Sequence, residues 1–210
     1  ANVGNPQVTY RETITKPVTH TEKYHRVLGG KEHTAEIVLR IEPLQRGSGN
    51  RFTSEVSKND LPKELIDAVG RGVEGAFSSG TMYGYQTIDI SAALADAKYS
   101  QTTSTPLAFE AAGSLGFDAA CRKADPVLLE PIMNLDVMTP KDFVGDVINH
   151  LTSKGGIIVS IESKTTIEHV RAQTPLRNMF GYSTSLRSMT QGRGTFAMEF
   201  SHFAPIENRK

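Results

Sequence analysis

The sequence has a single cysteine, no tryptophan and no excess of charge of either sign. One cysteine cannot form an internal disulfide. Cys121 stands among alanines in a helical pattern, so we expect a buried, unreactive thiol and a reducing compartment. Lysine plus arginine and aspartate plus glutamate number 23 each. Because a free-standing nucleic-acid binder usually has a basic excess, any RNA contact must come from local patches or from a larger parent protein.

Long apolar segments are also missing. No stretch approaches the ~20 apolar residues of a membrane-spanning helix, and no signal-peptide core is present. The chain begins at Ala1 without a methionine and enters a strand-like run directly, which indicates a fragment of a longer protein. A phosphate-binding loop is absent as well, because Gly29-Gly30-Lys31 is followed by Glu32, which has no hydroxyl for magnesium.

The histidines do not form a metal motif. His20, His25 and His33 are close in sequence, but their spacings fit no zinc site and no cysteine ligands accompany them. We interpret them as surface residues of neighbouring strands, with a metal site as the alternative. A Ser-His-Asp triad cannot be recognised from the sequence, because it is defined by the spatial arrangement of its side chains. The sequence therefore provides no argument for catalysis, and we expect no cofactor in this chain.

Hydrophobic periodicity predicts an α+β first half. Alternation predicts strands, and spacings of three and four predict helices; the strands are at 7–19, 35–41, 51–57 and 88–94, and the helices at 60–80 and 107–123. Asp60 is expected to cap the first helix, with Pro62 in its first turn and Gly80 at its end. The second helix has a face of alanines and glycines, which would let it lie close on a sheet.

The best candidate for a domain boundary is Ala124-Asp125-Pro126, which divides the chain into domains 1–124 and 125–210. Beyond it, the pattern is strand, helix, strand, strand, helix and strand; these segments are 133–137, 140–151, 157–161, 165–172, 175–189 with a break at Gly181, and 196–200. This order in about 80 residues is typical of the ferredoxin-like fold. We expect residues 204–210 to be frayed.

Two segments are candidates for contact with RNA. The loop from Lys98 to Pro106 is rich in hydroxyls, which bond to phosphate and ribose, although an ordinary polar surface loop is the alternative. In the turn from Gln191 to Thr195, two glycines flank Arg193, so the backbone could approach a phosphate while the guanidinium binds it. Arg177 and Arg187 could extend this basic edge, and a plain flexible turn is the alternative.

Three segments resemble the elongation factor G family of translational GTPases. Val3 to Ile14 is similar to the segment that opens domain IV of that family, and Leu129 to Met133 resembles the start of domain V. Leu176 to Gly194, which includes Met-Phe-Gly-Tyr-Ser-Thr and Leu-Arg-Ser-Met-Thr-Gln-Gly-Arg-Gly, resembles the second helix of domain V and the turn after it. These motifs occur in the right order and cover nearly the whole chain.

The resemblance implies an elongated two-layer β/α domain like ribosomal protein S5 domain 2, followed by a ferredoxin-like domain. It implies a cytoplasmic, monomeric factor that promotes GTP-dependent translocation on the ribosome, with rRNA, ribosomal proteins, tRNA and mRNA as partners and no membrane contact. The parent would be a ribosome-dependent GTPase whose GTP and magnesium sites lie in an N-terminal part outside this chain. Ribosome recycling within the same family and a stand-alone RNA-binding module are the alternatives.

The resemblance also implies which residues contact the ribosome. In the two loops at the tip of domain IV they are Tyr99, Ser100, Gln101, Thr102 and Thr103, and Gly29, Gly30, Lys31 and His33. The chemistry of the turn in domain V, given above, adds Arg187, Gln191 and Arg193 to the candidate contacts. Both tip loops depart from the family pattern. The family usually has a histidine and then acidic residues after the tyrosine of the longer loop, where neutral Ser100 to Thr103 stand here. The shorter loop usually continues Gly-Gly-x-Gly-Gln, where Gly29-Gly30-Lys31-Glu32-His33 stands here.

Overall fold

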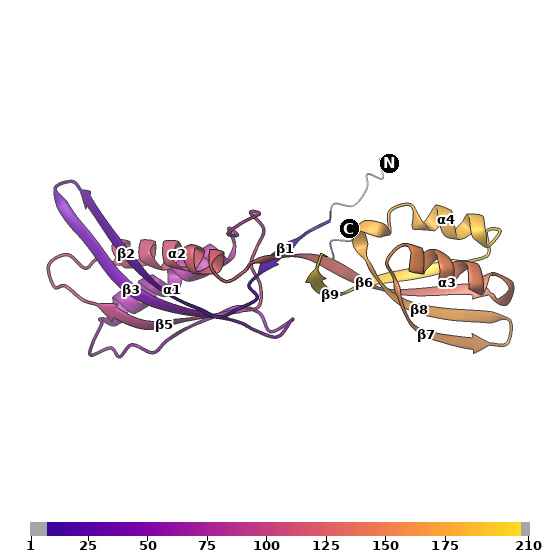
Figure 1. The fold of residues 1–210 in the computed structure, drawn as a ribbon, viewed down its shortest axis with the longest axis horizontal. Helices are drawn as coiled ribbons and strands as arrows, with labels where there is room; N and C mark the ends of the chain where they lie inside the picture. The colour runs from indigo at the N-terminus through magenta and orange to yellow at the C-terminus, as the bar shows by residue number, and fades with distance from the viewer. Residues whose placement is uncertain (1–7, 207–210) are drawn as a thin grey trace. The chain divides into compact units, whose positions relative to one another are not determined.

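The computed structural model describes residues 8–206, which form two compact units. One unit consists of residues 10–129, and the other of residues 130–206 together with residues 8 and 9. In each unit, helices cover one face of a β-sheet (Figure 1). The predicted class, two α+β domains, is confirmed.

The first unit is built on a four-stranded sheet in the order β2-β3-β5-β4, in which only β4 and β5 run parallel. A short strand, β1, pairs with the first residues of β6 (Val127–Pro140). The elements are β1 (Arg11–Thr13), β2 (Val18–Leu28), β3 (Lys31–Pro43), β4 (Arg51–Ser54), α1 (Lys63–Phe77), β5 (Ile90–Lys98) and α2 (Pro106–Arg122).

Strands β2 and β3 form a long hairpin whose register runs from Val18↔Ile41 to Leu28↔Lys31. Gly29 and Gly30 have φ angles of +58° and +79°, the left-handed values that a two-residue type I′ turn requires. The side chains of β3 alternate between the core and the outer face of the sheet. The inward-facing residues are Ala35, Ile37, Leu39 and Ile41, all of them buried as predicted.

The small-residue face of α2 packs on two partners. A Cβ atom on Gly116 would lie 3.0 Å from Cβ of Glu22 and 3.2 Å from Cδ1 of Leu39, so this part of the helix approaches the sheet as expected. A Cβ atom on Gly113 would lie 2.6 Å from the backbone oxygen of Val69, so the same face also packs directly on α1. The glycines therefore set two helix contacts at once.

Several details of the first unit differ from the prediction: α1 ends at Phe77 with Ser78 as its C-cap, before the expected Gly80, and β4 ends at Ser54 instead of residue 57. The strand expected at 7–19 is two strands, because the chain bends where the amides of Thr15 and Lys16 both bond to the carbonyl of Ala124; residue 7 lies outside the described part. The N-cap of α1 is Pro62 without a side-chain cap, and Asp60 belongs to the preceding turn. The strand expected at 88–94 begins later, after Asp89 with its φ of 60°.

The second unit has a sheet in the order β7-β8-β6-β9, with α3 and α4 on one face (Figure 1). Its elements are β6 (Val127–Pro140), a 3-10 turn (Lys141–Phe143), α3 (Val144–Ser153), β7 (Ile157–Lys164), β8 (Ile167–Pro175), a second 3-10 turn (Leu176–Asn178), α4 (Tyr182–Met189) and β9 (Thr195–Pro205). This order and the central position of β6 and β8 are the ferredoxin-like arrangement.

The core of the second unit lies between this sheet and its two helices. Leu135, Val137 and Val170 face α3 and α4, and the ring of Tyr182 packs edge-on against Phe196. Gly181, with a φ of +75°, separates the 3-10 turn from α4, as the sequence predicted. The prediction of a frayed end from residue 204 is wrong for Ala204 and Pro205, which belong to β9; residues 207–210 lie outside the described part.

Candidate functional site

The hairpin turn (residues 28–34) and the β5–α2 loop (residues 99–105) lie against each other in the first unit. The amide of Thr34 donates to the carbonyl of Thr103 over 2.9 Å, and the hydroxyls of these two threonines are 2.6 Å apart. Nδ1 of His33 lies 2.8 Å from the hydroxyl of Thr105. Two segments that the sequence marked separately, about 70 residues apart, therefore form one surface, which we call the paired loops.

Most hydroxyls of the β5–α2 loop are engaged inside it. The amide of Ser100 donates to Oγ of Ser104 over 2.8 Å, and the amide of Ser104 donates back to the carbonyl of Ser100 over 3.1 Å. Oγ of Ser100 accepts from the amide of Thr103 and contacts the hydroxyl of Thr102 at 3.2 Å. The row of hydroxyls thus builds a preformed loop, and only part of it faces outward.

The exposed groups of the paired loops include several larger side chains. Tyr99 is 45% exposed, and Gln101, Thr102 and Lys31 are also exposed. Sequence reasoning placed Lys31 and His33 in a loop. Both belong to β3, because the turn itself consists only of the two glycines.

The charge next to Tyr99 is compensated. Nζ of Lys98 lies 2.9 Å from Glu36, which also pairs with Lys23 at 3.4 Å. The ammonium of Lys98 lowers the pKa of Glu36, and the carboxylate in turn raises the pKa of Lys98. Lys31 has no ion-pair partner within 8–206, so it is the cation that the paired loops present to a partner.

The second unit contains the predicted arginine turn, which follows α4. Gln191 and Gly192 have φ angles of +52° and +77°. The amide of Gly192 donates to the carbonyl of Arg187, and the amide of Arg193 to that of Thr190. Oγ1 of Thr190 accepts from the amide of Gly194 over 2.8 Å. All three amides therefore have partners inside the turn, so a phosphate that approached this backbone would be bound by the side chains.

The side chains of this turn remain available for contact. Arg187, Gln191 and Arg193 are exposed, and the guanidinium of Arg193 lies over the ring of Phe143, 5.9 Å from its centre. Such stacking orients a guanidinium and leaves its N–H groups free to bond at the edge. The turn therefore offers oriented side chains to a partner, and its backbone amides are not available for binding.

Arg177 does not extend this basic edge. Its Nε donates to Oε2 of Glu130 over 2.6 Å, and the carboxylate of Glu130 is almost completely buried. A buried carboxylate needs a charged partner, so the guanidinium is held by the fold. The suggestion that Arg177 joins Arg193 is therefore wrong.

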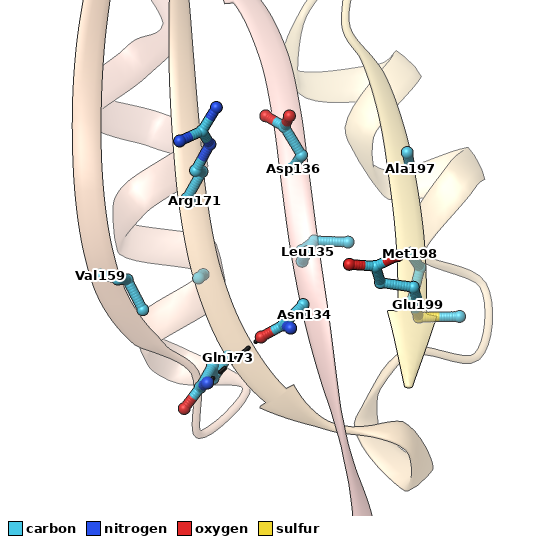
Figure 2. A pocket seen from close by; sticks show the side chains of 10 residues that line it. Asn134, Leu135, Asp136, Val159, Arg171, Gln173, Ala197, Met198 and Glu199 are labelled. Carbon is cyan, nitrogen blue, oxygen red and sulfur yellow. Dashed lines mark hydrogen bonds between the residues drawn. The ribbon is translucent and has the colours of Figure 1, made fainter. Parts of the chain in front are cut away.

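Sequence reasoning missed a hollow on the face of the second sheet opposite α3 and α4 (Figure 2). Asn134 and Asp136 of β6 lie there opposite Gln173 and Arg171 of β8, and Nε2 of Gln173 donates to Oδ1 of Asn134 over 3.2 Å. Glu199 of β9 completes the lining. The alternation of these polar residues with the buried ones was its only sequence signal. Its mixed charges favour neither an anion nor a cation.

The histidines form local contacts in the first unit. Nε2 of His20 lies 2.7 Å from Glu22, and Nδ1 of His20 lies 2.8 Å from Nζ of Lys123. His25 lies 3.4 Å from Glu32. Among the described residues, no group of three histidine, cysteine, aspartate or glutamate side chains is placed to hold a metal ion. None of the helices in that part is long and apolar enough to cross a membrane.

Cys121 is completely buried in the core of the first unit, as the sequence predicted. Burial, with smaller contributions from the charges of Asp118 and Glu12, raises the pKa of its thiol to about 12. We therefore expect an aromatic disulfide reagent at pH 8 to leave Cys121 unlabelled in the folded protein and to label it at once in denaturant. Rapid labelling without denaturant, measured by absorbance of the released thiolate, would contradict this burial.

Taken together, the two consecutive α+β units and their exposed polar loops define the class of the chain, a two-domain module of the kind found at the C-terminus of translational GTPases. The model of elongation factor G domain IV matches residues 6–125, and the model of the elongation factor G C-terminus matches residues 127–210. The chain therefore belongs to the elongation factor G family.

Two proteins that match the chain over nearly its whole length are also elongation factors G. The chain is 53% identical to "Elongation factor G 1" of Treponema denticola over 97% of its own length and 48% identical to "Elongation factor G" of Aquifex pyrophilus over 98%. It covers 31% and 29% of these two proteins. A crystal structure of a Thermus thermophilus protein matches 98% of the chain, and 31% of that protein, with a TM-score of 0.87 and 32% identity. The chain thus spans about a third of the length of these relatives.

Proposed function

We propose that the chain is the C-terminal part of a factor that promotes GTP-dependent translocation of tRNA and mRNA on the ribosome. The observation that carries this proposal is the match to two consecutive elongation factor G models over nearly the whole chain. The factor would act in the cytoplasm as a monomer. GTP and magnesium would be bound by a part of the factor outside this chain, and the chain would contribute binding and orientation.

The paired loops are the proposed contact with RNA in the decoding region. Lys31 supplies a positive charge, Gln101 supplies amide donors and an acceptor, and Tyr99 supplies an exposed ring that can stack on a base. Because the loop is already closed by its own hydroxyls, contact would cost little conformational entropy. Preorganisation of this kind suits a surface that must bind while its partner moves.

A purified translation system tests this proposal with the full-length factor. We expect the parent protein to accelerate tRNA–mRNA movement, and Gln101→Ala with Tyr99→Ala to slow that step about tenfold, which corresponds to about 1.4 kcal/mol of lost contact. Since both side chains are exposed, the unfolding midpoint should not change. Glu162→Ala, on an exposed position of β7, is the control. A parent factor that moves no tRNA would overturn the proposal.

The neutral β5–α2 loop favours ribosome recycling as the second candidate. Where the family usually has a histidine and acidic residues, this chain has Ser100 to Thr103, which carry no charge. A duplicated factor specialised for splitting ribosomes would not need the usual charges. Light scattering of ribosomes with recycling factor and GTP separates the two roles, because a splitting factor lowers the scattering whereas a translocation factor leaves it unchanged.

Arg193 is proposed to bind rRNA phosphate from the second unit. We expect Arg193→Ala to weaken ribosome binding of the full-length factor about fivefold to twentyfold at low salt and to reduce the slope of affinity against salt. Arg171→Ala, on the opposite face of the sheet, is the matched control. Sedimentation with ribosomes at several salt concentrations measures both quantities, and identical curves for parent and variant would leave Arg193 as a turn residue only.

A further inference from the structure

The β5–α2 loop leaves the sheet before it meets the hairpin again. The ladder between β3 and β5 ends at Glu36↔Lys98. Beyond that pair, within the described residues, His33 and Thr34 supply the hydrogen bonds from the hairpin to residues 99–105. The bonds between Ser100 and Ser104 make the loop compact, but they do not orient it relative to the hairpin. Among the described residues, the hydrogen bonds that orient the loop against the hairpin therefore come from two residues of β3.

Thr34 binds the loop at the backbone and at the side chain. Its amide donates to the carbonyl of Thr103, and its hydroxyl bonds to that of Thr103 over 2.6 Å. The two contacts converge on one residue, so they determine both the distance and the rotation of that peptide. An apolar side chain of the same shape at position 34 would keep the first contact and remove the second.

His33 holds the end of the loop where α2 begins. Thr105 is the N-cap of α2, and its Oγ1 accepts from the amide of Ala108 over 3.3 Å. The hydroxyl proton of Thr105 is therefore free to point at Nδ1 of His33, 2.8 Å away. The tautomer of His33 sets which of the two atoms donates, and either direction joins the ring to the same hydroxyl. The hairpin is thus connected to the loop and to the start of α2 through one hydroxyl.

We propose that His33 and Thr34 are positioning residues that lock the β5–α2 loop onto the hairpin, so that the paired loops meet the ribosome as one rigid surface. The effect on the ribosome rests on the proposed function, whereas the contacts of His33 and Thr34 with the loop do not depend on it. The sequence suggested His33 as a ribosome contact, whereas here its side chain bonds within the protein. Thr34 and Thr105, which the sequence did not single out, take part in the same contacts.

Amide hydrogen exchange on the chain tests the lock directly. We expect Thr34→Val to lower protection at least tenfold at the amides of Thr34 and Ser104, while amides of α1 keep theirs, because the opening is local. Thr21→Val, an exposed threonine of β2, is the matched control and should change neither. Unchanged protection in the loop would overturn the inference whatever happens on the ribosome. Equal loss of protection in α1 would also overturn it, because the effect would then be global.

The histidine is tested by two replacements. An asparagine amide can reach the place of Nδ1, so His33→Asn should keep the protection of the loop, whereas His33→Leu should lose it. His25→Leu, an exposed histidine of the same hairpin, is the control and should have no effect. If His33→Asn loosens the loop as much as His33→Leu does, the hydrogen bond is not what holds it, and the assignment fails.

The functional consequence is measured with the full-length factor in the translocation assay. Thr34→Val and His33→Leu should slow the step about threefold to tenfold, with His33→Asn restoring the parent rate. A loosened loop with an unchanged rate would overturn the positioning role. Failure of the parent protein itself to move tRNA would overturn the proposed function but would leave the exchange results, and hence the lock, standing. The two failures are therefore distinguishable.

Discussion

Gly72→Ala should unfold the first unit or destabilise it by at least about 3 kcal/mol. Gly72 lies where α1 crosses α2. A Cβ atom there would overlap the backbone oxygen of Glu110 and lie 2.9 Å from the backbone nitrogen of Ser114. A backbone cannot rotate away as a side chain can, so the two helices would have to separate. Because α2 also packs on β2 and β3 through Gly116, that separation would disturb the contact with the sheet.

Gly75→Ala is the matched control for this substitution. It lies one turn away on the same helix, and a Cβ atom there would meet nothing within 4 Å. Alanine has the higher helix propensity, so this variant should be more stable by about 0.5–1 kcal/mol. Urea unfolding followed by circular dichroism measures both changes. Equal effects of the two variants would show that helix propensity, and not the close crossing, decides the outcome.

Glu12→Ala should destabilise the first unit by about 3–5 kcal/mol. Glu12 is only 1% exposed, and its carboxylate accepts from three backbone amides of the segment between α1 and β5. One oxygen binds the amides of Thr81 and Met82, and the other binds the amide of Tyr85 over 2.8 Å. Removal of the carboxylate would leave these three donors without their partner, and each hydrogen bond to a charged group contributes about 1.5–3 kcal/mol.

Glu12→Gln is a second variant that tests the role of the carboxylate. The amide keeps one oxygen but turns an N–H group toward a backbone donor, so we expect a smaller loss of about 2 kcal/mol. Glu74→Gln, an exposed position on α1, is the control and should have no measurable effect. Hydrogen exchange should show the loss first at residues 81–85. Full stability of Glu12→Ala would mean that the loop does not depend on the carboxylate.

The elements that could be predicted from the sequence are those with a clear local periodicity. The alternation of Ala35, Ile37, Leu39 and Ile41 predicted β3, since burial on one face of a strand repeats every second residue. The break at Gly181 was also visible, because a helix begins anew after a left-handed glycine. Such signals are carried by neighbours in sequence. The split of the first strand was missed because it depends on the carbonyl of Ala124, far along the chain. Asp60 lies instead in a local turn, in which its amide bonds to the carbonyl of Ser57, and this turn competes with a capping role.

The candidate site was predictable only in part. The hydroxyl-rich loop and the arginine turn were visible as composition, but their chemistry was not. Ser100, a predicted ribosome contact, also closes its own loop, and Arg177 was expected to extend a basic edge and instead neutralises Glu130. In both cases the hydrogen-bond partner decides whether a polar group is available. A sequence shows the donor but not the acceptor that folding brings to it.

The sequence by itself determined the two α+β domains, the family, and the positions of the exposed loops, because these follow from periodicity and from motifs read along the chain. Only the tertiary structure decided which polar groups are occupied. His33 bonds to Thr105 across 72 positions, and Thr34 bonds to Thr103 across 69. Pairings over such separations arise from the way β3, β5 and α2 pack together. No local pattern records them, and they turn two separate loops into one surface.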